Sequence, residues 1–190
     1  MKTLIRTELL KKRNNLSGND KLNFSLKIKG TLVNLPEYKK AKAILCYMPI
    51  NNEVDTISLI KDSLKNKKRI ALPRVNKKEH SIEVFEIKNI DNDLEIGCYN
   101  ILEPKIENKR LNYSDIDLIL VPGVAFDCHG FRIGYGKGYY DRLLKNTNAA
   151  KIALAYEFQM HDNLPKESHD VCVDKIITEN RIIECGGELK

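Results

Sequence analysis

The sequence predicts an α/β fold in which a mainly parallel sheet carries helices on both faces. Short apolar segments of strand length alternate with longer segments whose apolar residues recur at helical spacing. A succession of strand, helix and strand favours parallel neighbours, because the helix returns the chain to the same end of the sheet. The chain has 190 residues and is 42% hydrophobic, which is enough for one buried core. We therefore expect a single domain over residues 1–190.

The elements follow from the spacing of the apolar residues. Two helices are predicted at the start of the chain, at residues 2–15 and 20–34, where leucines recur at helical intervals. A third helix is predicted at 54–65, between the first two strands, and a fourth after Gly138. The expected strands are the short apolar runs at residues 43–48, 69–73, 82–87, 118–121, 152–156 and 174–178.

The most informative segment runs from residue 121 to residue 141 and reads VPGVAFDCHGFRIGYGKGYYD. Its alternating glycines, Gly134, Gly136 and Gly138, let the backbone adopt positive φ and approach a ligand closely. The first amides of the helix that follows have no internal acceptor, so an anionic oxygen suits them. Lys137 adds a mobile charge, and Arg132 adds a planar group that can hold two phosphate oxygens. A lone Gly-x-Gly is often an ordinary tight turn, but three glycines among these charges predict a phosphate-binding loop.

This loop differs from a P-loop at two positions. Phe131 stands where a P-loop has its first glycine, and Gly138 stands where it has a serine or threonine. A magnesium ion on a bound nucleotide must therefore find its protein ligands elsewhere. Carboxylates are the ligands that magnesium accepts most readily, and Asp141 lies one turn into the following helix. Asp141 is thus the predicted metal ligand of the loop.

Polar residues follow several predicted strands at the point where each strand ends. In parallel sheets, ligands collect beyond the carboxyl ends of the strands. The segment from Met48 to Glu53 follows the first strand, Arg74 ends the second, and Pro122 leads to the glycine loop. We expect these segments to converge on one edge. Two alternatives stay open: Glu53 can be a first-turn acid of the helix at 54–65, and Arg74 can be a surface cation.

Charge and composition narrow the class of partner. The formal net charge of +6 suits either nucleic acid or small polyanionic substrates. The lysines are scattered, and the aromatic-and-basic motif of an RNA-recognition sheet is missing, so small polyanions are favoured. The five cysteines form no Cys-x-x-Cys pair, which predicts free thiols. No apolar run reaches the length of a membrane span, and we expect a cytoplasmic protein.

The chain resembles the 5-formyltetrahydrofolate cyclo-ligases, also called 5,10-methenyltetrahydrofolate synthetases, over nearly its whole length. The most specific part is the signature PGVAFD…GxRxGxGxGYYD within residues 117–142. Four shorter matches are Lys2 with Arg6, the segment YMP…EVDT at 47–56, LPR at 72–74 and EP at 103–104. The resemblance implies an α/β fold related to sugar-phosphate isomerases and CoA-transferases. It also implies use of ATP and Mg²⁺ to close 5-formyltetrahydrofolate into 5,10-methenyltetrahydrofolate through a phosphorylated formyl oxygen, with release of ADP and phosphate.

The resemblance also implies a role for each site residue. The implied catalytic residues are Lys137, Arg132 and Tyr139. The implied ATP-binding residues are Lys2, Arg6, Arg74, Gly134, Tyr135, Gly136, Lys137, Gly138, Tyr139, Tyr140 and Asp141. The implied substrate-binding residues are Met48, Glu53 and Tyr139, and the implied Mg²⁺ ligands are Asp141 and Asp174. Position 135 is expected to vary among relatives, and one of the adjoining Tyr139 and Tyr140 is expected to be structural.

Other interpretations of these residues remain. Without the resemblance, Lys2 and Arg6 are basic residues on a solvated helix, and Asp174 is a turn or strand-start acid. A sugar-phosphate isomerase on the same sheet would bind phosphate without needing ATP. A basic nucleic-acid-binding protein would lose affinity steeply with salt. We expect the partners to be 5-formyltetrahydrofolate and ATP, with no nucleic acid and no membrane, and we expect a monomer.

Overall fold

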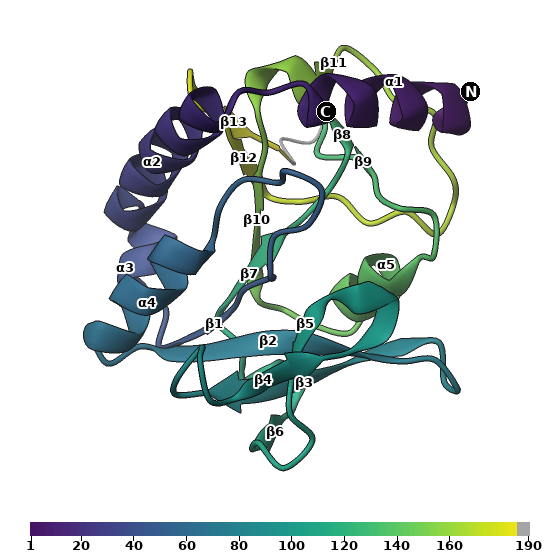
Figure 1. Ribbon diagram of the computed structural model, residues 1–190. Coiled ribbons are helices and arrows are strands. Elements are labelled where there is room, and N and C mark those ends of the chain that lie inside the picture. The colour runs from purple at the N-terminus through teal and green to yellow at the C-terminus, as the bar shows by residue number, and fades with distance from the viewer. Residues whose placement is uncertain (186–190) are drawn as a thin grey trace.

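A computed structural model describes residues 1–185 and shows an eight-stranded sheet at the centre of the molecule (Figure 1). The strand order is β13-β12-β10-β7-β1-β2-β3-β6. The parallel strands are β12 (Lys175–Ile177), β10 (Ala150–Leu154), β7 (Leu118–Val121), β1 (Ala43–Leu45) and β2 (Arg69–Asn76). The antiparallel strands at the two edges are β13 (Ile182–Glu184), β3 (Ser81–Ile87) and β6 (Arg110–Leu111). The prediction of a mainly parallel sheet is confirmed.

Helices cover both faces of this sheet, as predicted. One face carries α2 (Gly18–Asn34), α3 (Pro36–Lys40) and α4 (Ile57–Lys65), and the other carries α5 (Tyr139–Lys145) (Figure 1). Neighbouring residues of β1 show the division, because side chains alternate between the faces of a strand. Ile44 is buried with Ile28 and Ile60, whereas Leu45 is buried with Leu143.

A smaller layer supports the segment that contains the glycines. It consists of α1 (Lys2–Asn14) and a three-stranded sheet of β8 (Ala125–Asp127), β9 (Arg132–Ile133) and β11 (Met160–His161). Leu9 of α1 is buried against Ala125 and Ile133. The buried carboxylate of Asp127 accepts hydrogen bonds from the amides of residues 129, 131 and 164. This carboxylate fixes the turn between β8 and β9, and so fixes where Arg132 begins the glycine loop.

The remaining elements are short. A hairpin of β4 (Leu94–Ile96) and β5 (Leu102–Pro104) lies beside β2 and β3. Single 3-10 turns occur at residues 98–100, 113–115 and 157–159. Among residues 1–185, no helix combines the length and the apolar character needed to cross a membrane.

Several predicted boundaries differ from the structure. The strand predicted at 43–48 ends at Leu45, and the helix predicted at 54–65 begins at Ile57. The residues between them form a loop that is tied by its own hydrogen bonds, because Thr56 Oγ1 donates to the carbonyl of Tyr47 and Tyr47 Oη donates to the carbonyl of Val54. The strand predicted at 69–73 continues to Asn76 and turns into β3 as an antiparallel hairpin.

The strand order reverses between β1 and β7. From β1 the chain crosses through α4 to β2 on one side, whereas from β7 it crosses through α5 to β10 on the other side. A crevice opens at such a reversal, beyond the carboxyl ends of the strands, because the two connections leave the sheet in opposite directions.

Candidate active site

A cavity of about 920 Å³ opens at this edge of the sheet. Its wall includes Met48 and Glu53 after β1, Pro73 within β2 and Pro122 after β7, together with residues 132–141. The predicted convergence of these segments on one edge is therefore found in the structure. A volume of this size lies at the upper end of the range for small-molecule sites.

The three glycines of the loop have two different roles: two adopt the left-handed backbone conformation, and the third leaves space for a neighbouring side chain. Gly136 and Gly138 have φ of +88° and +64°, and Gly138 directly precedes α5. Gly134 does not share the positive φ expected of it. A side chain there would instead begin 3.3 Å from Nη1 of Arg132, so this glycine leaves room for the guanidinium.

Arg132 is buried in the cavity wall, with 4% of its side chain exposed. Its Nη2 donates to Oδ1 of Asp141 across 2.9 Å. Its Nε is also buried and has no hydrogen-bond partner among residues 1–185. An unpartnered buried donor costs free energy, and an anionic ligand in the cavity is the natural partner for it.

Lys137 is exposed on the loop and lines the cavity. Its backbone carbonyl accepts a hydrogen bond of 2.9 Å from Arg142, which holds the loop against the start of α5. The ammonium group is thus carried on a fixed backbone but keeps a mobile side chain. This arrangement suits a group that must follow a phosphate during its transfer.

The two cations at the start of α1 face the same cavity. Arg6 Nε donates to the carbonyl of Gly134 across 2.8 Å. Lys2 Nζ lies 2.9 Å from Asp170 and 3.0 Å from Glu167, both in the loop that follows β11. The four-residue spacing therefore places both cations at one cavity rather than on a solvated face, with Arg6 against the glycine loop and Lys2 against the loop after β11.

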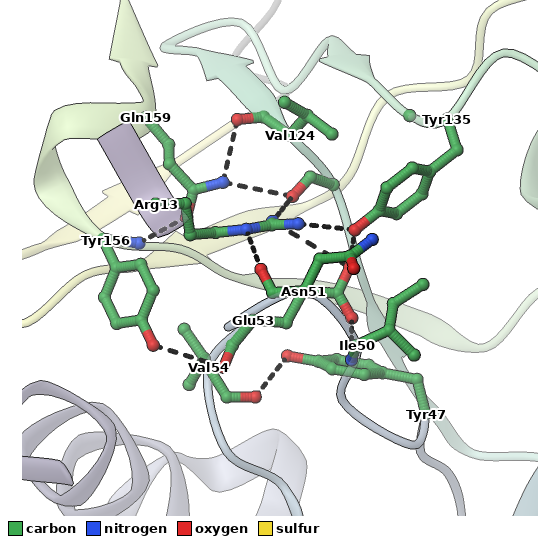
Figure 2. Close-up of polar contacts among 12 residues, drawn as sticks. Arg13, Tyr47, Ile50, Asn51, Glu53, Val54, Val124, Tyr135, Tyr156 and Gln159 are labelled. Atoms are coloured by element: carbon green, nitrogen blue, oxygen red, sulfur yellow. Dashed lines mark hydrogen bonds and ion pairs between the residues drawn. The ribbon is translucent and has the colours of Figure 1, made fainter. Parts of the chain in front are cut away.

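A buried polar network lies beside the cavity (Figure 2). Arg13 is 1% exposed and donates to the carbonyls of Asn51 and Gly123, at 2.8 and 3.1 Å, and to the hydroxyl of Tyr135. Glu53 is 5% exposed, and its Oε1 lies 4.0 Å from Nη1 of Arg13. The two oxygens of Glu53 accept hydrogen bonds from the amide of Ile50 and the hydroxyl of Tyr135.

Burial has the largest effect on the pKa of Glu53. It raises the pKa of this carboxyl to about 7, while the charge of Arg13 and the hydrogen bonds from Ile50 and Tyr135 act to lower it. Glu53 lies in the loop before α4, which begins at Ile57, so the alternative of a first-turn helix acid is wrong. A carboxyl that titrates near neutral pH in a ligand cavity is suited to binding or proton transfer.

The adjoining tyrosines both line the cavity. The hydroxyl of Tyr140 is buried and has no hydrogen-bond partner among the described residues, and burial raises its pKa. Tyr139 lies nearer the surface, with the guanidinium of Arg142 5.3 Å from the centre of its ring. Both rings also pack against the core on the α5 face, so each has a structural contact.

Two predicted site residues do not reach the cavity. Arg74 lies within β2, and its guanidinium donates to the Glu95 carboxylate and the Pro104 carbonyl, both at 2.7 Å. Its strand neighbours on either side line the cavity, and alternation turns Arg74 away from it. Asp174 precedes β12 and accepts a hydrogen bond of 2.7 Å from the Lys151 amide. It therefore lies at the amino end of the strands, opposite to the cavity, and not beside Asp141.

Arg13 is one of the residues that could not be assigned from the sequence. A usable signal was present, because Arg13 follows Arg6 by seven residues and so shares its face of a helix. The acids at 167 and 170 were also missed. They lie in a loop without regular structure, and their link to Lys2 spans more than 160 residues of sequence.

Comparison with known proteins shows which family the chain belongs to. The model of the 5-formyltetrahydrofolate cyclo-ligase family matches residues 1–179. A 5-formyltetrahydrofolate cyclo-ligase of Mycoplasma pneumoniae is 35% identical over 182 residues, covering 94% of this chain and 98% of that protein. One from Haemophilus influenzae is 32% identical and covers 88% of this chain and 91% of its own. The solved 5,10-methenyltetrahydrofolate synthetase of Aquifex aeolicus superposes with a TM-score of 0.88 at 40% identity, covering 100% of this chain and 96% of that one. The chain therefore belongs to the 5-formyltetrahydrofolate cyclo-ligase family of enzymes.

Proposed function

We propose that this protein converts 5-formyltetrahydrofolate to 5,10-methenyltetrahydrofolate, with ATP and Mg²⁺, and releases ADP and phosphate. The observation that carries the proposal is that two kinds of polar group line one cavity. The lining includes the glycine loop with four cations, Arg132, Lys137, Lys2 and Arg6, and also the buried carboxyl of Glu53. The cationic loop suits a polyphosphate, and the buried carboxyl suits the polar edge of a neutral heterocycle.

The chemistry explains why both substrates are needed. A formamide oxygen is a poor leaving group, so direct ring closure would have to expel an oxygen close to hydroxide. Transfer of the γ-phosphoryl group to the formyl oxygen solves this problem. N10 then attacks the formyl carbon and loses its proton, the carbon–oxygen bond breaks, and phosphate leaves. Phosphoryl transfer of this kind depends on positioning and on neutralising charge more than on covalent help from the protein.

Each cation has a place in this scheme. Arg132, whose buried Nε has no hydrogen-bond partner within residues 1–185, is suited to hold a phosphate oxygen at the cavity wall, and Lys137 can follow the transferring group. Lys2 and Arg6 hold the nucleotide from α1. Lys2 must exchange its contacts with Asp170 and Glu167 for contacts with phosphate. Tyr135, Tyr139, Tyr140 and the three glycines complete the nucleotide side of the loop, with Tyr139 also touching the folate beside Met48 and Glu53.

The residues present fit a magnesium ion that is carried by the nucleotide. One oxygen of Asp141 accepts from Arg132, which leaves the second oxygen as a ligand. Among residues 1–185, no cluster of three or more His, Cys, Asp or Glu side chains could hold a metal by itself. Magnesium usually keeps several waters and binds through phosphates with one or two carboxylates, so a dedicated cage is not required. When bound, the ion neutralises charge on the phosphates.

A direct assay tests the proposal. The protein is mixed with 5-formyltetrahydrofolate and Mg-ATP, and the methenyl chromophore is followed in the near ultraviolet while ADP is measured in parallel. We expect the two products to appear in equal amounts. Methenyl formation at an undiminished rate without nucleotide would overturn the ATP requirement. Turnover of a sugar phosphate without ATP would instead support the isomerase alternative.

We also propose that the enzyme works as a cytoplasmic monomer, without nucleic acid or membrane. All the cavity walls described above come from one chain, and the five cysteines are free thiols, as expected in a reducing compartment. Size-exclusion chromatography with light scattering tests the first point. A dimer mass would contradict it.

A further inference from the structure

Arg13 occupies an unusual place in this fold, because it is fully buried and yet lies behind the cavity wall rather than in it. Each of its three guanidinium nitrogens has an acceptor. The acceptors are the carbonyl of Asn51 after β1, the carbonyl of Gly123 after β7 and the hydroxyl of Tyr135 in the glycine loop (Figure 2). One side chain therefore ties together the three loops that bound the cavity.

Glu53 lies directly in front of this guanidinium, on the cavity side. Its Oε1 is 4.0 Å from Nη1 of Arg13 and accepts a hydrogen bond of 3.3 Å from Tyr135, while its Oε2 accepts one of 3.1 Å from the amide of Ile50. Removing a carboxylate from water is costly unless a cation and hydrogen-bond donors replace the lost solvation. Arg13 and Tyr135 provide this replacement.

We infer that Arg13 is a positioning residue of the active site, which, with Tyr135, orients the Glu53 carboxylate toward the folate and favours its ionised form. The inference rests on the proposed function for the identity of the substrate. In that reaction a bond forms between N10 and the formyl carbon, the bond from that carbon to the phosphorylated oxygen breaks, and N10 loses a proton. An ionised Glu53 can accept that proton, whereas a protonated one cannot.

The groups that face Glu53 come from four elements. They are Arg13 of α1, Tyr135 of the glycine loop, Tyr47 after β1 and Tyr140 of α5. Burial and the charge of Glu53 raise the pKa of each of these three tyrosines, so they stay neutral while Glu53 titrates. Arg13 supplies the positive charge that opposes the effect of burial on Glu53. Loss of that charge should therefore raise the pKa of Glu53 above about 7 and leave it protonated at neutral pH.

The test measures the titration of Glu53 directly. The protein is labelled with [δ-¹³C]glutamate, and the Glu53 resonance is assigned by its loss in Glu53→Gln. Its midpoint should lie near 7 in the wild type, and Arg13→Met should move it upward by roughly one pH unit or more, the size expected for losing an adjacent opposite charge. Arg13→Lys should give a smaller upward movement, because it keeps the charge and loses the planar group. The acid limb of kcat/KM should move by the same amount in each variant.

The matched control is Lys12→Met, which removes the charge of the residue that directly precedes Arg13 in α1. Lys12 is half exposed and pairs with Glu8 at the surface, so the midpoint of Glu53 should stay where it is in the wild type. Arg13→Met can fail to fold, since three loops lose a buried partner. Tyr135→Phe then supports the test, because it removes one donor to Glu53 and should also raise the midpoint, by less than the loss of a full charge.

The outcomes separate the inference from the proposed function. An unchanged Glu53 midpoint in folded Arg13→Lys and Tyr135→Phe would overturn the inference, even if the enzyme is active. An unchanged acid limb despite a moved midpoint would also overturn it, because Glu53 would then titrate without a part in turnover. Lack of any cyclo-ligase activity in the wild type would overturn the proposed function, and the resonance titration would still decide whether Arg13 controls Glu53.

Discussion

Arg132 and Asp141 are joined across the mouth of the glycine loop by an ion pair of 2.9 Å between Nη2 and Oδ1. Both side chains are largely buried, at 4% and 17% exposure. Separating the members of a buried pair leaves each charge uncompensated and costs free energy. The ion pair therefore holds the two ends of the glycine loop in a fixed relative position. It also turns Arg132 so that its remaining donors are left for a ligand.

This pair makes Asp141 the carboxylate that should govern the magnesium requirement. We expect Asp141→Asn to move the midpoint of the Mg²⁺ activation curve to higher concentration, because an amide is a weaker ligand for a hard cation. Asp174→Asn is the matched control. Its carboxylate accepts from the Lys151 amide at the far end of the sheet, so its activation curve should follow the wild type. Coincident curves for Asp141→Asn and the wild type would contradict the assignment.

Much of the fold could be predicted from the sequence, because its central strands and long helices have strong apolar patterns. For example, β7 is buried along its whole length, and β10 is buried over its last three residues. The small layer beside α1 could not be predicted. Its strands are two or three residues long, and contacts distant in sequence, such as the Leu164 amide on Asp127, hold them in place.

Lys137→Ala should lose much more turnover than stability. The side chain is exposed and packs little, but it lies on the cavity wall where phosphate would pass. Loss of one charge contact to a transition state can cost on the order of 3 kcal/mol, or about a hundredfold in kcat. Lys145→Ala, at the far end of α5 and outside the cavity, should keep normal kcat. A wild-type kcat in folded Lys137→Ala would show that Lys137 is a solvated surface residue with no part in turnover.

Lys2→Ala and Arg6→Ala should each raise the KM for ATP more than the KM for the folate. Both side chains line the cavity, and Arg6 is already held against the glycine loop by the Gly134 carbonyl. Lys11→Ala, an exposed residue on the same helix, serves as the control and should change neither constant. Steady-state kinetics with each substrate varied in turn gives the comparison. An unchanged KM for ATP in both Lys2→Ala and Arg6→Ala would show that α1 supports the fold but does not bind ATP.

The site could be predicted where glycines and charged residues are adjacent in the sequence. It could not be predicted where it depends on how a strand residue is placed in the sheet. The loop from Gly134 to Asp141 is contiguous, so its chemistry could be read directly. Whether Arg74 lines the cavity depends on which face of its strand the side chain lies on. Whether Asp174 lies near Asp141 depends on which end of the sheet it occupies. The apolar pattern of the strands predicts neither. Arg13 contacts its acceptors only after the chain has folded, because they lie 38 to 122 residues away.

Glu53→Gln should stabilise the fold at alkaline pH and leave it nearly unchanged in acid. The pKa of Glu53 is about 7 in the folded protein, against an ordinary value of 4.5, so the folded state binds this proton more tightly than the unfolded state. Stability contributed by the group is therefore present in acid and is lost as pH rises from about 4.5 through 7. The loss is on the order of 3 kcal/mol at about 1.4 kcal/mol per pH unit.

Urea unfolding of wild type and Glu53→Gln from pH 5 to 8.5 measures this loss of stability. Glu8→Gln is an exposed control that should show no such trend. A constant difference in unfolding free energy between wild type and Glu53→Gln across this range would show that Glu53 does not titrate with a raised pKa.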